Sequence, residues 1–173
     1  MRFLLALIAA LGVAGCAGYE LGPIKPTPMK SVQKIYVKNV TNDTLHPRIE
    51  VLLTNILIKQ IQQDGTYEIT DENRADAILK VHISEIERRP ARSLRGNVLQ
   101  TREFLLNLRA RYEVMKTSTG AIIDARNVVG TTSFFVSSPN LTTADSNQDE
   151  RQAIPLAAED LATRITSLIS EGW

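Results

Sequence analysis

Hydrophobic and polar positions change their spacing along the chain in a way that predicts strands and helices in turn. A short, mostly alternating apolar run ending at Val40 predicts a half-buried strand over residues 35–40. The next apolar stripe has helical spacing. It is formed by Ile49, Leu52, Leu53, Ile56, Leu57 and Ile61. We expect Pro47 at the first position of this helix and Asp64-Gly65 at its end.

The middle of the chain has the alternation of a sheet. Residues 66–70 predict a brief extended element and residues 76–86 a second strand. The clearest alternation is in residues 104–114, where Phe104, Leu106, Leu108, Ala110, Tyr112 and Val114 share one face. A Thr-Ser-Thr-Gly turn then predicts a hairpin, with residues 121–136 as the returning strand and Gly130 as the place of a bulge.

A second amphipathic helix is predicted at the end of the chain. Ser146 with Asp149 forms a capping-box pattern that predicts its start. Its apolar stripe consists of Ile154, Ala158, Leu161, Ile165, Leu168 and Ile169. Pro155 either kinks this helix or marks its true first turn, and the pattern leaves both open. Residues 87–102 and 137–147 show no apolar period and are expected to be loops.

These elements predict an α+β fold, an α/β two-layer sandwich. Its simplest form places two amphipathic helices on one face of a mixed four-stranded sheet. The other face would be polar, because the residues that alternate with the apolar ones include Lys80, His82, Arg109 and Arg111. With 173 residues and 43% hydrophobic composition, the chain is long enough for one domain with a substantial core.

The first residues have the pattern of an export signal. Arg2 is followed by an apolar run over residues 3–11, which is too short to span a bilayer. The segment Val13-Ala14-Gly15-Cys16 resembles the lipobox of bacterial lipoproteins, and this resemblance implies that Cys16 becomes the lipidated first residue.

We therefore expect a signal peptide at 1–15, a lipidated cysteine and short tether at 16–31, and one domain at 32–173. The lipobox resemblance also implies that the cysteine carries three lipid chains, which exceed the roughly two signals that stable membrane anchoring requires. An alanine rather than an aspartate after the cysteine is similar to the outer-membrane signal of Gram-negative lipoproteins.

Charge and motif content exclude several classes of function. Without residues 1–15 the chain loses one of its 20 basic residues and equals the 19 acidic ones, so nucleic-acid binding is not expected. His46 and His82 are far apart in sequence, and no hydrolase, metalloprotease, phosphate-loop or dinucleotide motif is present. We expect a protein that is not an enzyme and has no cofactor and no metal site.

Arginines gather in the predicted loop at 87–102. Arg88, Arg89, Arg92, Arg95 and Arg102 occur there without an acidic residue among them. The guanidinium fork matches phosphate and carboxylate in bidentate fashion. This composition is compatible with a solvated loop, and it also predicts a site for an anionic partner, either a phosphorylated lipid or an acidic protein wall.

The whole mature sequence resembles the lipopolysaccharide-assembly lipoproteins of the LptE family. The resemblance begins with Gly15-Cys16-Ala17-Gly18-Tyr19 and includes the strand, Asn-x-Thr turn and helix of residues 35–57. It continues through the strand starting at 76, the Glu87-Arg88-Arg89-Pro90 pattern, the strand over 103–114 and the closing helix. The order and spacing of these segments carry the resemblance.

Membership would imply a protein tethered to the outer membrane that sits in the lumen of the LptD β-barrel. Such a protein helps the barrel fold and contacts lipopolysaccharide. The resemblance implies that Arg88, Arg89, Arg92 and Arg95 face lipopolysaccharide phosphates or the barrel wall. It also implies that the polar face with Arg109 and Arg111 suits a water-filled lumen.

A second class of lipoproteins shares the strand and helix with which this domain begins. Other periplasmic lipoproteins of this kind activate cell-wall synthases or assist secretion. Such activators usually carry a long disordered tether, whereas only about fourteen residues separate Cys16 from Ser31. The short tether favours a partner in the same membrane.

Overall fold

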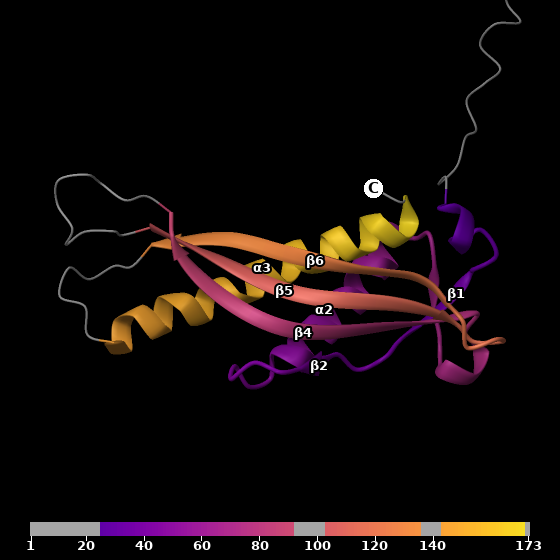
Figure 1. Cartoon of the computed structure of the whole chain (residues 1–173), viewed down its shortest axis with the longest axis horizontal. Coiled ribbons are helices and arrows are strands. Elements are labelled where there is room, and N and C mark those ends of the chain that lie inside the picture. The colour runs from indigo at the N-terminus through magenta and orange to yellow at the C-terminus, as the bar shows by residue number, and fades with distance from the viewer. Residues whose placement is uncertain (1–24, 92–102, 136–142, 172–173) are drawn as a thin grey trace, which may run out of the picture.

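A computed structural model describes residues 25–91, 103–135 and 143–171, with side chains from 149 onward in the last range. Two short 3-10 turns are η2 (Thr27–Met29) and η3 (Glu72–Arg74). The strands are β1 (Lys34–Val37), β2 (Thr41–Asn42), β3 (Glu68–Ile69), β4 (Ala77–Pro90), β5 (Glu103–Lys116) and β6 (Ile122–Phe135). The helices are α2 (Ile49–Asp64) and α3 (Thr143–Ser170). Figure 1 shows the elements as two layers, with both helices behind the long strands.

The sheet has six strands, so the prediction of four was too low. The order is β3-β1-β4-β5-β6, and β2 also pairs with β4. β1 is parallel to β3 and β4, and β2 is parallel to β4, whereas β4, β5 and β6 form an antiparallel meander. The predicted extended element at 66–70 became β3. The turn after the first strand contributed β2, a two-residue strand that has no pattern of its own.

β4 is longer than its sequence pattern predicts. It runs to Pro90, which lies opposite Phe104 of β5. The expectation of a loop beginning at Glu87 is therefore wrong. A register shift between Ile83 and Glu85 interrupts the alternation there, and this hid the continuation of the strand.

The two helices cover one face of the sheet, as predicted, and the structure shows that they also pack against each other. α2 begins at Ile49 rather than Pro47, because Arg48 before it has a left-handed backbone with φ of 69°. Arg48 is the only residue other than glycine with positive φ in the described part of the chain. Gly65, with φ of 75°, ends the helix as predicted.

α3 begins earlier than its capping pattern predicts. It starts at Thr143, so Ser146 and Asp149 lie inside the helix. Residues 143–147 of the predicted loop are therefore helical, and the rest of that loop lies outside the described residues. Pro155 lies inside the helix, which excludes its assignment to the first turn. Because proline lacks an N–H, the carbonyl four residues earlier loses its helical partner.

Small residues bring α3 close to the sheet. Ala153, Ala157, Ala158 and Ala162 are all buried between α3 and its neighbours. Gly130 of β6 pairs with Leu108 in unbroken register, so the predicted bulge is wrong. A Cβ added to Gly130 would lie 2.2 Å from the carbonyl oxygen of Ala157. The glycine is there because the helix backbone passes directly over it.

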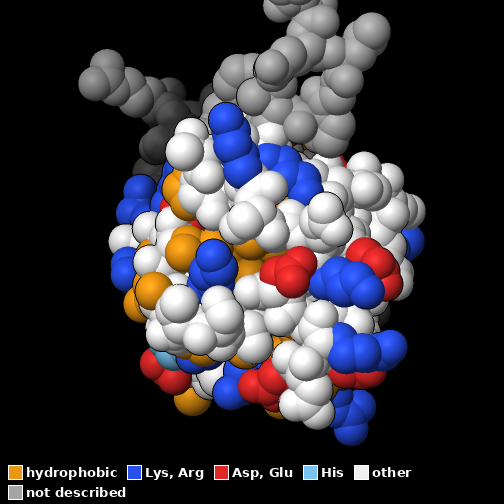
Figure 2. All heavy atoms as spheres, turned by 90° about the vertical axis from the view of Figure 1, so that its right-hand side faces the viewer, with side chains coloured by type: hydrophobic (Ala, Val, Ile, Leu, Met, Phe, Trp, Pro, Cys, Tyr) orange, Lys and Arg blue, Asp and Glu red, His pale blue; other side chains and the backbone are white. Residues whose placement is uncertain are grey.

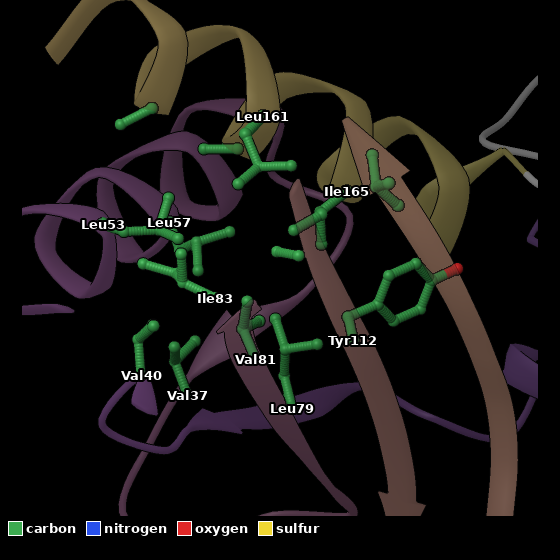
Figure 3. Packing of buried hydrophobic residues seen from close by; sticks show 14 of the residues in the cluster. Val37, Val40, Leu53, Leu57, Leu79, Val81, Ile83, Tyr112, Leu161 and Ile165 are labelled. Atoms are coloured by element: carbon green, nitrogen blue, oxygen red, sulfur yellow. The ribbon is translucent and has the colours of Figure 1, made fainter. Parts of the chain in front are cut away.

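Aliphatic side chains from both layers form one core. In Figure 3, Leu53 and Leu57 of α2 and Leu161 and Ile165 of α3 point toward residues of the central strands. Met29 of η2 is fully buried in the same cluster, so the end of the predicted tether packs on the domain.

Polar contacts join the helix ends. The hydroxyl of Ser170 donates to Asp64 at 2.9 Å, and that of Tyr67 donates to the carbonyl of Ile169. Burial, together with the nearby Asp64, raises the pKa of Tyr67. Within the described residues, neither helix combines the length and hydropathy that crossing a membrane requires.

Candidate functional site: the basic residues of the sheet

The predicted arginine site is divided between the two faces of the sheet. Arg88 and Arg89 are consecutive in β4, so their side chains point to opposite faces. Arg88 lies opposite the buried Leu106 and faces the helices. Arg89, Arg109 and Arg111 are on the uncovered face, which we call the open face. Arg92, Arg95 and Arg102 lie outside the described residues, as does Cys16.

Arg88 belongs to a cluster that ties three elements together. Its Nη1 lies 3.3 Å from Oε2 of Glu150 in α3, and its guanidinium stacks 5.2 Å from the ring centre of Phe104. Nε2 of His46, just before α2, lies 3.8 Å from the other oxygen of Glu150. Glu150 is largely buried, with 15% of its side chain exposed. These contacts point to a structural role for Arg88 and His46.

The arginines of the open face are paired with carboxylates. Nε of Arg89 lies 2.6 Å from Glu87, and Nη2 of Arg109 lies 3.3 Å from the same carboxylate. Nε of Arg109 is also 3.3 Å from Glu85. The hydrogen bond from Arg89 and a weaker one from Arg109 lower the pKa of Glu87, and Glu87 raises the pKa of Arg89. This half of the open face is a network of both signs rather than a basic patch.

Arg111 is paired in the same way. Its Nε lies 3.2 Å from Oε1 of Glu113, two positions along β5. Ion pairs as exposed as these stabilise a fold by only about 0–1 kcal/mol. Their charges can therefore exchange partners with a docking molecule at low cost.

The acidic members of these contacts were not predicted from the sequence. Ion pairs of the arginines with Glu85, Glu87 and Glu113 could have been predicted, because strand residues two apart share a face. Glu150 had no such signal, because it is 62 residues from Arg88. Mixed charge also characterises the end of the molecule seen in Figure 2, where Lys and Arg side chains alternate with Asp and Glu.

His82 is on the open face, as predicted. Its Nε2 lies 3.0 Å from Asp43, and its Nδ1 lies 2.9 Å from the hydroxyl of Thr41. These two contacts hold the ring of His82 against β2 and the residue that follows it. No group of three or more His, Cys, Asp or Glu side chains in the described ranges could hold a metal ion.

Comparison with known proteins decides the family. A family model described as "LptE: Lipopolysaccharide-assembly" matches residues 32–169. The chain belongs to the LptE family. The match is to the family that the sequence resembles, so it confirms that resemblance. The family acts in lipopolysaccharide assembly and is not a family of enzymes. None of the curated proteins matches the chain.

Solved structures share the fold of this LptE-family chain at low identity. Protein XCC0632 from Xanthomonas campestris is 11% identical with a TM-score of 0.55, covering 79% of this chain and 82% of that one. The hypothetical protein CT253 from Chlamydia trachomatis is 7% identical with a TM-score of 0.52, covering 79% and 97%. A PelC variant from Paraburkholderia phytofirmans, solved as a dodecamer, is 14% identical with a TM-score of 0.50, covering 80% and 89%. These likenesses concern the fold alone.

Proposed function

We propose that this LptE-family protein is an outer-membrane lipoprotein that helps to assemble the LptD β-barrel and plugs its lumen. In that position it assists the insertion of lipopolysaccharide at the cell surface. The observation that carries the proposal is the family match over residues 32–169, which covers nearly the whole domain. The protein acts as a structural partner and performs no chemistry of its own.

The distance between the lipid and the domain supports a partner in the same membrane. Cys16 is the proposed lipidation site, and Lys25 already contacts the domain through Val32 and the ring of Tyr67. Nine residues of extended chain reach roughly 30 Å at most. The domain therefore stays near the membrane surface, which suits a barrel better than a cell-wall synthase deep in the periplasm.

The open face supports docking inside a hydrated lumen. Its described arginines are half exposed and already held in defined positions by Glu85, Glu87 and Glu113. Such an arrangement presents charged donors and acceptors of both signs on one face. We propose Arg89, Arg109 and Arg111 as contacts to the barrel wall or to lipopolysaccharide. Arg92 and Arg95 remain candidates from the sequence, whereas Arg88 is occupied on the helix side.

The test is affinity co-purification from detergent-solubilised outer membranes. Wild type is compared with an Arg89→Ala/Arg109→Ala/Arg111→Ala variant, and Arg164→Ala serves as a control on the helix layer. Arg164 has a similar exposure and pairs with Asp160 four residues before it. Recovery of a large LptD-type barrel with the wild type and the control supports the proposal.

The variant separates the two kinds of contact. Loss of the barrel assigns the three arginines to the protein interface. Recovery of the barrel with less lipopolysaccharide assigns them to the lipid. If wild type instead recovers a cell-wall synthase or a secretion component and no barrel, the proposal is wrong and the protein is an accessory of another envelope machine.

A further inference from the structure

One long edge of the sheet has no partner strand. β6 is the last strand in the sheet order, and in the described part of the chain it pairs with β5 alone. η2 contacts β6, and Figure 1 shows η2 at the end of the molecule where the strand begins. This leaves residues 127–135, the last nine of the strand, as the free edge, which we call the β6 edge.

The backbone of the β6 edge points half of its polar groups away from β5. The N–H of Thr131 donates to Oδ2 of Asp160 in α3 at 2.8 Å, so it is not used in the ladder with Asn107 opposite. Residues of an antiparallel strand alternate between bonding to the partner strand and pointing away from it. The outward set is therefore Asn127, Val129, Thr131, Ser133 and Phe135. Their N–H and C=O groups form a row that another extended chain can continue.

The β6 edge lacks the features that usually protect a free strand. Its sequence, Asn-Val-Val-Gly-Thr-Thr-Ser-Phe-Phe, contains no charged residue and no proline. Charges, prolines, bulges or shortness normally prevent pairing at an edge. Six of the nine residues are β-branched or aromatic, a composition that favours strand pairing. The register with β5 is unbroken over these residues, so no bulge turns the edge away.

Exposed apolar side chains border the β6 edge on both faces. Phe135 is 65% exposed at the end of the strand, where it belongs to the outward set on the open face. Leu156 of α3 is 53% exposed. It lies four residues before Asp160, so it shares the side of the helix from which Asp160 reaches the edge. A strand added to β6 would cover both apolar side chains.

The position of α3 over β6 limits the kind of strand that fits. A Cβ on Gly130 would lie 2.2 Å from the carbonyl oxygen of Ala157 and 2.7 Å from the backbone nitrogen of Leu161, so the helix passes directly over the strand. Neighbouring strands are about 4.8 Å apart, whereas the axes of packed helices are about 8–10 Å apart. A second copy paired along β6 would bring its own α3 too close to the first. The added strand must come from a sheet that carries no helix on that face.

We infer that the β6 edge pairs with a strand of the partner barrel before that barrel closes. The inference rests on the proposed function, which supplies a barrel as the partner. Barrel strands carry no covering helix, span the membrane with about 9–11 residues and alternate apolar with polar side chains. The nine residues of the β6 edge match that length. A closed barrel has no free strand, so the pairing is confined to assembly.

The two sides of such a strand match the two sides of the β6 edge. Its apolar side chains would lie against Leu156 on the helix side, where an exposed apolar side chain is otherwise left in water. Its polar side chains would lie beside the uncharged Asn127, Thr131 and Ser133 and continue the polar open face.

Asp160 keeps the middle of the edge occupied until a strand arrives. The oxygen that accepts from Thr131 also lies 2.8 Å from Nε of Arg164. An incoming carbonyl can take over the N–H of Thr131 while Asp160 keeps its ion pair with Arg164. A carboxylate at a strand edge also opposes pairing with other chains. Asp160 therefore protects the edge and releases it at low cost.

The experiment is photo-cross-linking in growing cells, with benzoylphenylalanine at Ser133 of the full-length chain, an exposed member of the outward set. Newly made proteins are pulse-labelled and irradiated at intervals. We expect a cross-link to the barrel chain that is strongest soon after synthesis. It should disappear as the barrel reaches its closed form, which resists unfolding in SDS without heating. The same probe at Asn55, an exposed residue of α2, is the control and should not give this time course.

Two substitutions at Asn127 separate charge from size. Asn127→Glu places a carboxylate opposite Arg111 of β5, which pairs with it within the sheet and preserves the fold. The same charge opposes strand addition, so the early cross-link should fall about tenfold, equivalent to ~1.4 kcal/mol. Asn127→Gln has the same length without the charge and should leave the cross-link unchanged.

A third variant tests the edge in the opposite direction. Asp160→Ala frees the N–H of Thr131 and removes the protecting charge, so the early cross-link should rise several-fold. A variant that had simply lost its structure could not give this gain. An unchanged or weaker cross-link contradicts the inference.

The outcomes separate this inference from the proposed function. If the wild type co-purifies with no barrel, the proposed function is wrong and the inference falls with it. If the barrel co-purifies but Ser133 gives no early cross-link, or Asn127→Glu and Asn127→Gln behave alike, the inference alone is overturned. A cross-link between two copies, or to residues of the same chain before Lys25, also overturns it, because another segment then covers the edge.

Discussion

A side chain at Gly130 should push α3 away from the sheet. Its Cβ would lie 2.2 Å from the carbonyl oxygen of Ala157 and 2.6 Å from Cβ of Leu161. Ordinary contacts of a Cβ begin near 3.4 Å, so the helix would have to retreat by more than an ångström. Both neighbours are fixed by the helix backbone, and no change of rotamer relieves the overlap.

The cost follows from packing. Extra methylene groups in a filled interior cost about 1–3 kcal/mol, and more where the backbone must move. Here the retreat of α3 also loosens Leu161 and Ile165, which are completely buried. Alanine regains less than about 1 kcal/mol by restricting the unfolded chain. We expect Gly130→Ala to lower the free energy of unfolding by about 2–3 kcal/mol.

Urea denaturation followed by circular dichroism measures this change. With a slope of roughly 2 kcal/mol per molar urea, the midpoint should fall by about 1–1.5 M. Gly65→Ala is the matched control, because its Cβ meets nothing within 4 Å and only its positive φ opposes the substitution. That strain costs roughly 1–2 kcal/mol. If Gly130→Ala is no more destabilising than Gly65→Ala, the close approach of α3 to β6 is refuted.

Three further changes test the polar contacts, each by urea denaturation. Thr54→Val should destabilise the fold by about 1–3 kcal/mol, because the Thr54 hydroxyl accepts the buried N–H of Val40 at 3.0 Å and its loss leaves that N–H unpaired; unchanged hydrogen exchange at Val40 would contradict this. Thr166→Val should stabilise the fold by about 1 kcal/mol, because the buried Thr166 hydroxyl has no hydrogen-bond partner among the described residues; a loss of stability would show that the hydroxyl is satisfied. Hydrogen bonds from the backbone N–H groups where β1 begins lower the pKa of Asp76. The contribution of Asp76 to the free energy of unfolding is therefore complete above the ordinary carboxyl pKa of about 3.9, and it is lost as the pH falls through the lower pKa of the folded state. Asp76→Asn should therefore flatten the decline of the midpoint below about pH 4, and an unchanged decline would refute this assignment.

Local patterns determined the main elements and the faces they bury. The alternation in β5 correctly placed Leu106, Leu108 and Tyr112 in the core and Arg109 and Arg111 on the open face. This succeeds because the side chains of a strand alternate regardless of its partners. The stripe of α2 and its glycine end were equally local, whereas the start of α2 depended on the conformation of Arg48.

Elements without a pattern were decided by their neighbours. β2 and β3 are two residues long, and their backbone groups become strands only because β4 and β1 lie beside them. The last residues of β4 had lost their alternation at a register shift, and pairing with β5 extends the strand to Pro90. A sequence pattern describes the conformational preference of one segment, whereas strand pairing depends on two segments.

The same reason limits prediction of the site. The sequence by itself determined that arginines cluster around Arg88, but the tertiary structure decided that Arg88 turns to Glu150 of α3 while Arg89 turns to Glu87. It also decided that Gly130 serves a close approach rather than a bulge, because the atoms it must avoid belong to a helix about 30 residues later. Composition fixes which charges a chain has, whereas their partners are set by distances that exist only after distant segments have packed.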